Sequence, residues 1–275
     1  MTGERIEVLA NADACSDAAA ELIARTLIEA AAARGAAHWA TTGGSTPAAI
    51  YRRLAASPLR DEIPWEQVQL WWGDDRFVPA DHPLSNVHVA TSDLLEIGAL
   101  SGESGTGGLG ADVGGRRPGA PLHASNVHQV PVAGAIARSE GPGWAAERYA
   151  EELAAAGPAL VDGVPAFDLV LVGVGPDGHI LSVFPGSVAF DRLEPVLPIP
   201  APTHIEPHVP RVTLNPRVVA AARSVVVVVH GAGKASILGE VLGGEIDERR
   251  WPAQLARREG ATWIVDEAAA SSIRR

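Results

Sequence analysis

The sequence predicts an α/β fold, built on an open, mainly parallel sheet with helices on both faces. Two short apolar runs, residues 169–172 and 225–229, have the composition of strands that are buried on both sides, as in parallel sheets. Segments with helical periodicity alternate with the predicted strands, and this alternation is typical of a parallel sheet covered on both faces. The chain has 275 residues, of which 47 % are hydrophobic, so it can bury the core of one large domain or two small ones.

The spacing of apolar residues places strands and helices along the whole chain. The predicted strands are residues 6–9, 38–42, 68–72, 126–130, 169–172, 211–215, 225–229 and 262–265. The predicted helices are residues 13–33, 47–54, 86–95, 144–156 and 216–222, with a further helix beginning near residue 234. Pro47 suits a first helical turn, where its missing N–H group costs no hydrogen bond.

Two segments are expected to lie outside the regular elements. Residues 98–121 are rich in glycine and poor in apolar side chains, so they predict a flexible insertion or surface loop. Residues 199–210 are rich in proline and predict an irregular surface segment.

Composition limits the partners and the compartment. A formal net charge of −11 argues against nucleic-acid binding, which needs a basic face, although it allows a local cationic site for a small anion. One cysteine, Cys15, permits no disulfide within the chain and indicates a reducing compartment. No long apolar segment follows the N-terminus, so neither a signal peptide nor a membrane span is predicted. These features predict a cytoplasmic protein without a membrane partner.

The loop after the predicted strand 169–172 is the first candidate site, because open α/β sheets bind ligands at the carboxyl ends of their strands. It contains His179, a candidate acid–base group because histidine as a residue type titrates near neutral pH, and Asp177, which is close enough to orient it. Residues 173–178 also satisfy the dinucleotide pattern G-x-G-x-x-G. Pro185 follows too soon for the long helix that this fingerprint opens, so a nicotinamide site is disfavoured. A histidine in such a loop more often satisfies a backbone group than catalyses.

Three further loops carry groups that suit an anion. Residues 43–47 combine Gly43 and Gly44, which allow close approach, with the hydroxyls of Ser45 and Thr46 at a helix start. Lys234 is the single lysine of the chain and lies in a glycine-rich loop that also precedes a predicted helix. The residues around it lack the spacing of a nucleotide-binding P-loop. Arg76 follows the predicted strand 68–72, where its planar fork of donors suits a carboxylate, a phosphate or an oxyanion.

Each of these loops also has a simpler explanation. A capped helix start needs only one of the hydroxyls, the lysine can be solvated, and Arg76 can pair with its acidic neighbours. No G-x-S-x-G motif is present, so water activation is favoured over a serine nucleophile. His204 and His208 are separated by Pro207 and cannot form a helical zinc pair. No metal and no cofactor are expected.

Together these motifs resemble those of the 6-phosphogluconolactonase family, within the glucosamine-6-phosphate isomerase/6-phosphogluconolactonase superfamily. The matching segments occur in the family's order: residues 42–47 (TGGSTP), 72–79 (WGDDRFVP), 85–86 (SN), 173–179 (GVGPDGH), 184–185 (FP), 211–214 (RVTL), 231–234 (GAGK) and 251–253 (WPA). The chain departs from the family at Asp75, where glutamate is usual, and at Leu181, where a small residue is usual. The resemblance implies a single Rossmann-like α/β domain over residues 1–275, interrupted by the glycine-rich insertion. Nothing in the sequence requires more than a monomer.

The resemblance further implies hydrolysis of 6-phospho-D-glucono-1,5-lactone to 6-phospho-D-gluconate, in the oxidative pentose phosphate pathway. His179, oriented by Asp177, would activate water, and Arg76 would stabilise the oxyanion. The phosphate would be bound by Gly43, Gly44, Ser45, Thr46, Arg211 and Lys234. Whether Arg76 or Arg211 holds the phosphate is left open.

Two other functions are considered. Glucosamine-6-phosphate deaminase resembles the chain in two loops, but that family has glutamate where this sequence has Phe184. Ring opening and deamination need additional carboxylates to shuttle protons, which Phe184 cannot supply. A non-catalytic sugar-phosphate sensor would not require His179, so the acid–histidine pair disfavours it.

Overall fold

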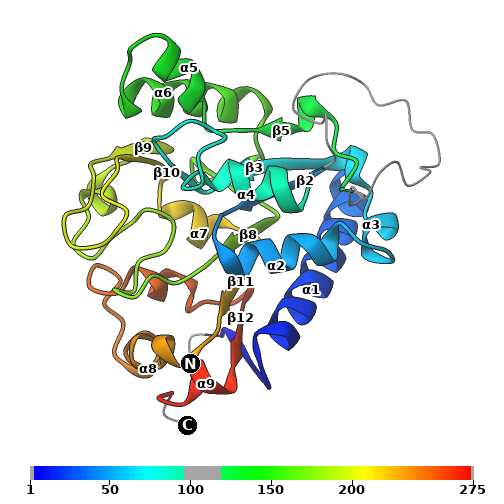
Figure 1. The fold of residues 1–275 in the computed structure, drawn as a ribbon, viewed down its shortest axis with the longest axis vertical. Coiled ribbons are helices and arrows are strands. Elements are labelled where there is room, and N and C mark those ends of the chain that lie inside the picture. The colour runs from blue at the N-terminus through cyan, green and yellow to red at the C-terminus, as the bar shows by residue number, and fades with distance from the viewer. Residues whose placement is uncertain (1–2, 96–118, 274–275) are drawn as a thin grey trace.

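A computed structural model describes residues 3–95 and 119–273 of the chain. Its centre is a seven-stranded sheet with the spatial order β1-β12-β11-β8-β2-β3-β5 (Figure 1). Every neighbouring pair of strands in this sheet is parallel. The strands are β1 (Arg5–Leu9), β2 (Ala37–Thr41), β3 (Val68–Trp72), β5 (Val127–His128), β8 (Leu169–Val172), β11 (Ser224–Val229) and β12 (Ala261–Asp266). The predicted α/β fold with a mainly parallel sheet is therefore confirmed.

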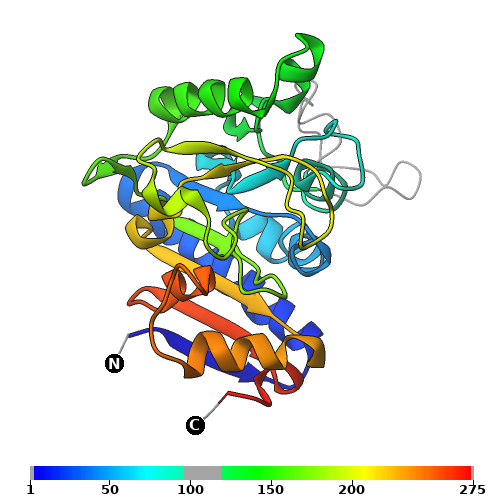
Figure 2. The same cartoon turned by 90° about the vertical axis from the view of Figure 1, so that its left-hand side faces the viewer.

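Helices cover both faces of this sheet. The long helix α1 packs on β2, β11 and β12, and α8 lies on the opposite side of β11 and β12 (Figures 1 and 2). Asn11 caps the start of α1 by accepting a hydrogen bond from the Ala14 N–H group at 2.9 Å. The helices are α1 (Ala12–Arg34), α2 (Ser45–Leu54), α3 (Leu59–Glu62), α4 (Asn86–Asp93), α5 (Val132–Ala137), α6 (Pro142–Ala156), α7 (Arg217–Ala221), α8 (Ala235–Gly243) and α9 (Glu267–Ala270).

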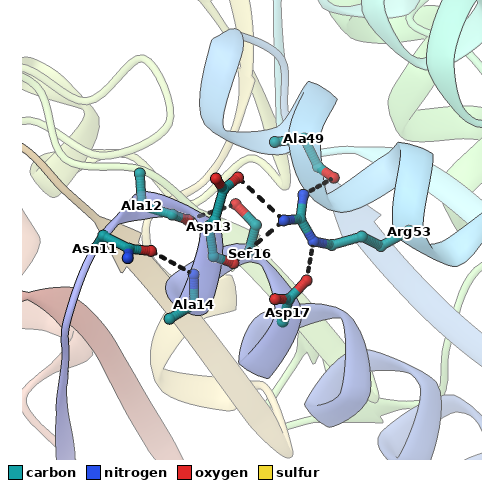
Figure 3. A network of polar contacts seen from close by, with 8 residues as sticks. All are labelled: Asn11, Ala12, Asp13, Ala14, Ser16, Asp17, Ala49 and Arg53. Atoms are coloured by element: carbon teal, nitrogen blue, oxygen red, sulfur yellow. Dashed lines mark hydrogen bonds and ion pairs between the residues drawn. The ribbon is translucent and has the colours of Figure 1, made fainter.

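Polar contacts fix helix α2 against helix α1 (Figure 3). Arg53, near the end of α2, donates hydrogen bonds to the carboxylates of Asp13 and Asp17 in the first turns of α1. The same guanidinium donates to the Ala49 carbonyl at 3.0 Å. Both carboxylates are exposed, so each pair contributes less than about 1 kcal/mol of stability. Their effect is to orient α2, whose first turn lies beside the carboxyl end of β2.

A second, three-stranded antiparallel sheet, β4-β10-β9, was only partly predicted. It consists of β4 (Asp74–Arg76), β9 (Val196–Ile199) and β10 (Arg211–Leu214), of which only β10 was expected as a strand. β4 is three charged residues long and has no apolar alternation, so local sequence gives no strand signal. Pro198 weakens the signal for β9, and it is tolerated because β9 is an edge strand. The short hairpin β6 (Leu160–Val161) and β7 (Val164–Pro165) was also missed.

The other predicted elements are present with small shifts in their ends. The helix predicted for residues 86–95 ends at Asp93, and the strand predicted for residues 126–130 covers only Val127–His128. Residues 200–210 are irregular, as predicted. Most of the insertion predicted at residues 98–121 lies outside the described residues. Within the described part of the chain, no helix is long and apolar enough to cross a membrane.

The strand order creates a crevice between β2 and β8. From β2 the chain continues outward through β3 to β5, whereas from β8 it continues to the opposite edge through β11 and β12. The connections therefore leave these two neighbouring strands in opposite directions, which opens the space above their carboxyl ends. The loops that follow β2, β3 and β8 meet there.

Candidate active site

A cavity of about 260 Å³ opens at the carboxyl ends of β2 and β8. Among the predicted site residues, Gly43, Arg76, His179 and Arg211 line it. The remaining lining residues are Thr42, Asp74, Gly173, Val174, Gly175, Pro176, Leu181, Ile205 and Glu206. The fold thus brings together loops that are separated by more than a hundred residues in the sequence.

The loop after β8 presents His179 to the cavity. The Gly175 N–H group donates to the His179 carbonyl at 2.8 Å, and the Gly178 N–H group donates to the Gly175 carbonyl at 3.1 Å, which closes a tight turn. A Cβ atom on Gly175 would lie 2.1 Å from Nδ1 of His179, so the backbone packs directly against the imidazole. Glycine is therefore required at position 175 to hold the ring, and the motif serves histidine placement rather than a dinucleotide.

Asp177 orients the imidazole of His179. Its Oδ1 atom accepts a hydrogen bond from Nδ1 of His179 at 2.5 Å, which leaves Nε2 as the atom able to take a proton. Burial acts to raise the pKa of Asp177, but hydrogen bonds from His179 and His204 outweigh it and hold the pKa well below its usual range. Asp177 is therefore an anion at neutral pH, placed behind the histidine rather than in the cavity lining.

Arg76 and Arg211 lie opposite each other in the β4–β10 pair. Arg211 is 2 % exposed, and its Nη2 atom donates only weakly to the Pro207 carbonyl, at 3.3 Å. Arg76 is half-buried and donates from Nη1 to the Leu84 carbonyl at 2.8 Å. The Nε atoms of both are buried without a hydrogen-bond partner, and no ion pair involves either arginine within the described residues. Two guanidiniums that line one cavity and make no ion pair have the chemistry that suits an anion.

Asp75 holds the backbone around Arg76 rather than its guanidinium. Its Oδ1 atom accepts from the backbone N–H groups of Arg76 at 2.8 Å and Asn86 at 2.7 Å, and its Oδ2 atom accepts from the Ser85 hydroxyl at 3.1 Å. These bonds tie β4 to the start of α4. Burial raises the pKa of Asp75 to about 7, despite the three donors that favour its ionised form.

Replacing Asp75 with asparagine is expected to remove a pH-dependent loss of stability. The folded-state pKa exceeds the unfolded value of about 4, so the contribution of Asp75 to stability is complete below pH 4 and is lost as pH rises through 7. We expect wild type to lose on the order of 4 kcal/mol relative to Asp75→Asn between pH 4 and pH 8. Chemical denaturation at several pH values measures this difference. A difference that stays constant over the range would contradict it.

Asp74 is a cavity residue that the sequence did not single out. Its Oδ2 atom accepts from the Ser182 hydroxyl at 2.5 Å, and its Oδ1 atom accepts from the Asn86 side chain at 3.1 Å. Asn86 also packs against the loop after β2, because a Cβ atom on Gly43 would lie 2.3 Å from its Oδ1 atom. In the sequence, the indication that Asp74 belongs to the site was its position in the same motif as Arg76.

The remaining predicted anion-binding groups surround the cavity without lining it. Thr46 hydrogen-bonds through its hydroxyl to Nε2 of His230 at 2.8 Å, whereas Gly44 and Ser45 are exposed at the start of α2. Lys234 donates from Nζ to the Val174 carbonyl at 2.5 Å, and burial lowers its pKa. The structure therefore ties the lysine to the histidine-bearing loop and leaves these four residues outside the cavity lining.

The sequence alone also did not predict that Leu181 and the segment 204–206 lie at the candidate site. Leu181 has a φ of 53°, a conformation that costs a leucine about 1 kcal/mol or more, and its side chain lines the cavity. Its unusual identity relative to the family was the only signal. Ile205 and Glu206 line the cavity from a proline-rich segment that carries no periodic signal. Across the described residues, no three His, Cys, Asp or Glu side chains are grouped so that they could hold a metal ion.

Comparisons with known proteins show which proteins this chain resembles. Residues 10–264 match the family model described as glucosamine-6-phosphate isomerases/6-phosphogluconolactonase. The chain is 31 % identical over 274 residues to a 6-phosphogluconolactonase of Synechocystis sp., covering 98 % of each chain. It is 35 % identical over 269 residues to a 6-phosphogluconolactonase of Streptomyces coelicolor, covering 94 % of this chain and 91 % of the relative. The solved 6-phosphogluconolactonase of Trypanosoma cruzi superposes with a TM-score of 0.79 at 26 % identity, covering 100 % and 99 % of the two chains.

Proposed function

The chain belongs to the glucosamine-6-phosphate isomerase/6-phosphogluconolactonase family, and on that basis we propose that it hydrolyses 6-phospho-D-glucono-1,5-lactone to 6-phospho-D-gluconate. This makes it a carboxylic ester hydrolase of the pentose phosphate pathway. The observation that carries the proposal is the cavity in which an aspartate-oriented histidine lies with two unpaired arginines. The cytoplasmic location and the monomeric state remain predictions, which fractionation and light scattering would test.

In the proposed reaction, His179 is the general base. Nε2 of the imidazole takes a proton from water as the water oxygen attacks the lactone carbonyl, and Asp177 stabilises the resulting imidazolium. The tetrahedral intermediate carries a negative oxygen, for which Arg76 supplies donors held in place before the reaction. The protonated His179 then gives its proton to the ring oxygen as the carbon–oxygen bond breaks. The product is the open-chain acid, and His179 returns to its neutral form.

We assign the phosphate to Arg211, supported by the surrounding loops. A phosphate is a permanent anion, and Arg211 is a charged, buried side chain that makes no ion pair in the described structure. Lys234 and the start of α2, with Gly43, Gly44, Ser45 and Thr46, add positive potential at the rim. Binding the remote phosphate positions the carbonyl carbon near His179, which lowers the entropic cost of reaction.

One structural observation bears on the deaminase alternative. Phe184 packs against the His179 ring, with the ring centroids 4.8 Å apart, at the position where the deaminases have a glutamate. An apolar ring there provides no carboxylate to shuttle protons during ring opening. The same His179–Asp177 pair disfavours a sensor that only binds sugar phosphates, because phosphate binding alone does not use an oriented base.

The decisive experiment compares two substrates in parallel. The lactone is generated in situ, and its disappearance is followed with and without the protein, so that spontaneous hydrolysis is subtracted. Glucosamine 6-phosphate is offered under the same conditions, and ammonia release is measured. Faster lactone loss without ammonia supports the proposal. Ammonia release without faster lactone loss would reassign the chain to the deaminases, and binding without either reaction would favour a sensor.

Replacing Lys234 with alanine is expected to weaken binding of phosphorylated ligands about tenfold while changing kcat little. The lysine contributes charge near the proposed phosphate position, and one charge-assisted contact corresponds to about 1.5 kcal/mol or more. Steady-state kinetics on the lactone, with inhibition by inorganic phosphate, measures this change. An unchanged KM would remove Lys234 from the phosphate site and leave it only the hydrogen bond to the Val174 carbonyl.

A further inference from the structure

We propose that His204 is a positioning residue that acts on His179 through Asp177, and that it sets the lower pH limit at which His179 works as a base. This inference deepens the proposed function and concerns the same site. It assigns a role to a histidine in the irregular segment between β9 and β10, outside every motif that the sequence singled out.

The carboxylate of Asp177 is shared between two histidines. Its Oδ1 atom contacts Nδ1 of His179 at 2.5 Å, and its Oδ2 atom contacts Nε2 of His204 at 2.9 Å. Phe184 lies beside both imidazoles, with ring centroids 4.8 Å from His179 and 5.5 Å from His204. The three polar groups therefore form a continuous chain, supported by one apolar ring.

The protonation state of Asp177 fixes the direction of the second hydrogen bond. An ionised carboxylate can only accept, so His204 donates from Nε2 whether its ring is neutral or charged. The His204 side chain is 51 % exposed, so its ring is open to solvent. His179 is 15 % exposed and reaches solvent chiefly through the cavity.

The hydrogen bond from His204 to Asp177 weakens the interaction between Asp177 and the Nδ1 proton of His179. A carboxylate that already accepts a hydrogen bond from His204 stabilises the His179 imidazolium less strongly. A charged His204 also repels that imidazolium. Both effects favour the neutral form of His179, which is the form that can accept a proton from water. His204 therefore extends the working range of the base toward lower pH.

Other charged groups around the pair act on the same titration. Lys234 and Arg211 interact with Asp177, and Arg76 lines the same cavity, so these cations also favour neutral His179. The carboxylates of Asp74 and Glu206 line the cavity and oppose them. These five charged groups are all retained in a His204 variant. A change in the titration of His179 in that variant is therefore assigned to the substitution at position 204.

The same contact places part of the cavity wall. Ile205 and Glu206 directly follow His204 and line the cavity. The segment is also held by the contact of His208 Nδ1 with the Pro202 carbonyl at 2.7 Å, by the weak bond from Arg211 to the Pro207 carbonyl, and by the packing of Ile205 on the core. Loss of the His204–Asp177 contact should therefore also raise KM for the lactone.

Two substitutions separate the hydrogen bond from the rest of the side chain. His204→Ala removes the donor, whereas His204→Gln keeps a donor amide at similar reach without an ionisable ring. We expect the acid limb of the pH profile of kcat/KM to move up by about 0.5 to 1 pH unit in His204→Ala and to return toward wild type in His204→Gln. His123→Ala, at a histidine that caps the short helical turn before β5, is the matched control and should leave the limb in place.

A readout independent of catalysis keeps this inference separate from the proposed function. NMR titration of the His179 imidazole in the ligand-free protein should show the same upward shift in His204→Ala and its reversal in His204→Gln. An unmoved His179 titration in His204→Ala, or a shift that glutamine does not reverse, would overturn the inference even in an active lactonase. The expected shift in a protein without lactonase activity would support the inference while rejecting the function.

Discussion

Replacing His179 with alanine should reduce enzymatic turnover of the lactone by at least about a hundredfold, to near the spontaneous rate. General-base catalysis by a positioned side chain contributes roughly 10² to 10⁴ in rate, and the described cavity offers no equivalent group at the same place. Binding of 6-phospho-D-gluconate should persist, because the two arginines that face the cavity are unchanged. The measurement is initial-rate kinetics with the spontaneous reaction subtracted, paired with calorimetric titration of the product.

The control for this experiment must exclude a collapsed site. The imidazole packs against the backbone of Gly175 and the ring of Phe184, so its removal leaves a gap in the loop. His179→Asn, which retains a polar planar side chain near Asp177, should be equally inactive with a smaller loss of stability. His123→Ala should retain full activity. Turnover near the wild-type level in either His179 variant would reject the general-base assignment.

The second large effect is expected at Arg211. Replacing this side chain with methionine, which is apolar and of similar length, should raise KM for the lactone by about a hundredfold, since it removes charge-assisted hydrogen bonds worth about 1.5 to 3 kcal/mol each. The same substitution should leave the free energy of unfolding unchanged or increase it. Arg211 is buried and makes no ion pair in the described structure, and burial lowers its pKa, so keeping it charged destabilises the fold.

The matched variant is Arg76→Met, on the strand opposite. We expect it to lower kcat with a smaller change in KM, because the oxyanion appears only in the transition state. Denaturation curves and steady-state kinetics on the two variants together test the assignment. If Arg76→Met raised KM and Arg211→Met lowered kcat, the two arginines would exchange roles. A strongly destabilised Arg211→Met variant would contradict the view that its charge serves ligand binding rather than the fold.

The local elements were predictable because their signals are local. The valine run in β11 and the helical spacing of α1 are properties of short windows, and both are present as predicted. Gly173 and Gly175 of the β8 loop line the cavity, while the packing of Gly175 on His179 became evident only from the fold. Strand β4 was missed because it pairs with a distant segment, β10, and has no apolar pattern of its own. Strand β9 was missed because Pro198 weakens its strand signal.

By itself, the sequence determined the fold class, the family and the identity of the central histidine, because motif residues and periodicity can be read along the chain. Only the tertiary structure decided that Arg76 and Arg211 face each other, that His204 shares Asp177 with His179, and that Lys234 binds a backbone carbonyl outside the cavity lining. The arginine pair depends on the antiparallel register of β4 and β10, which lie more than a hundred residues apart, and the other two contacts join segments 27 and 60 residues apart. Contacts between separate segments are set by the packing of the whole core, which cannot be predicted from a short stretch of sequence.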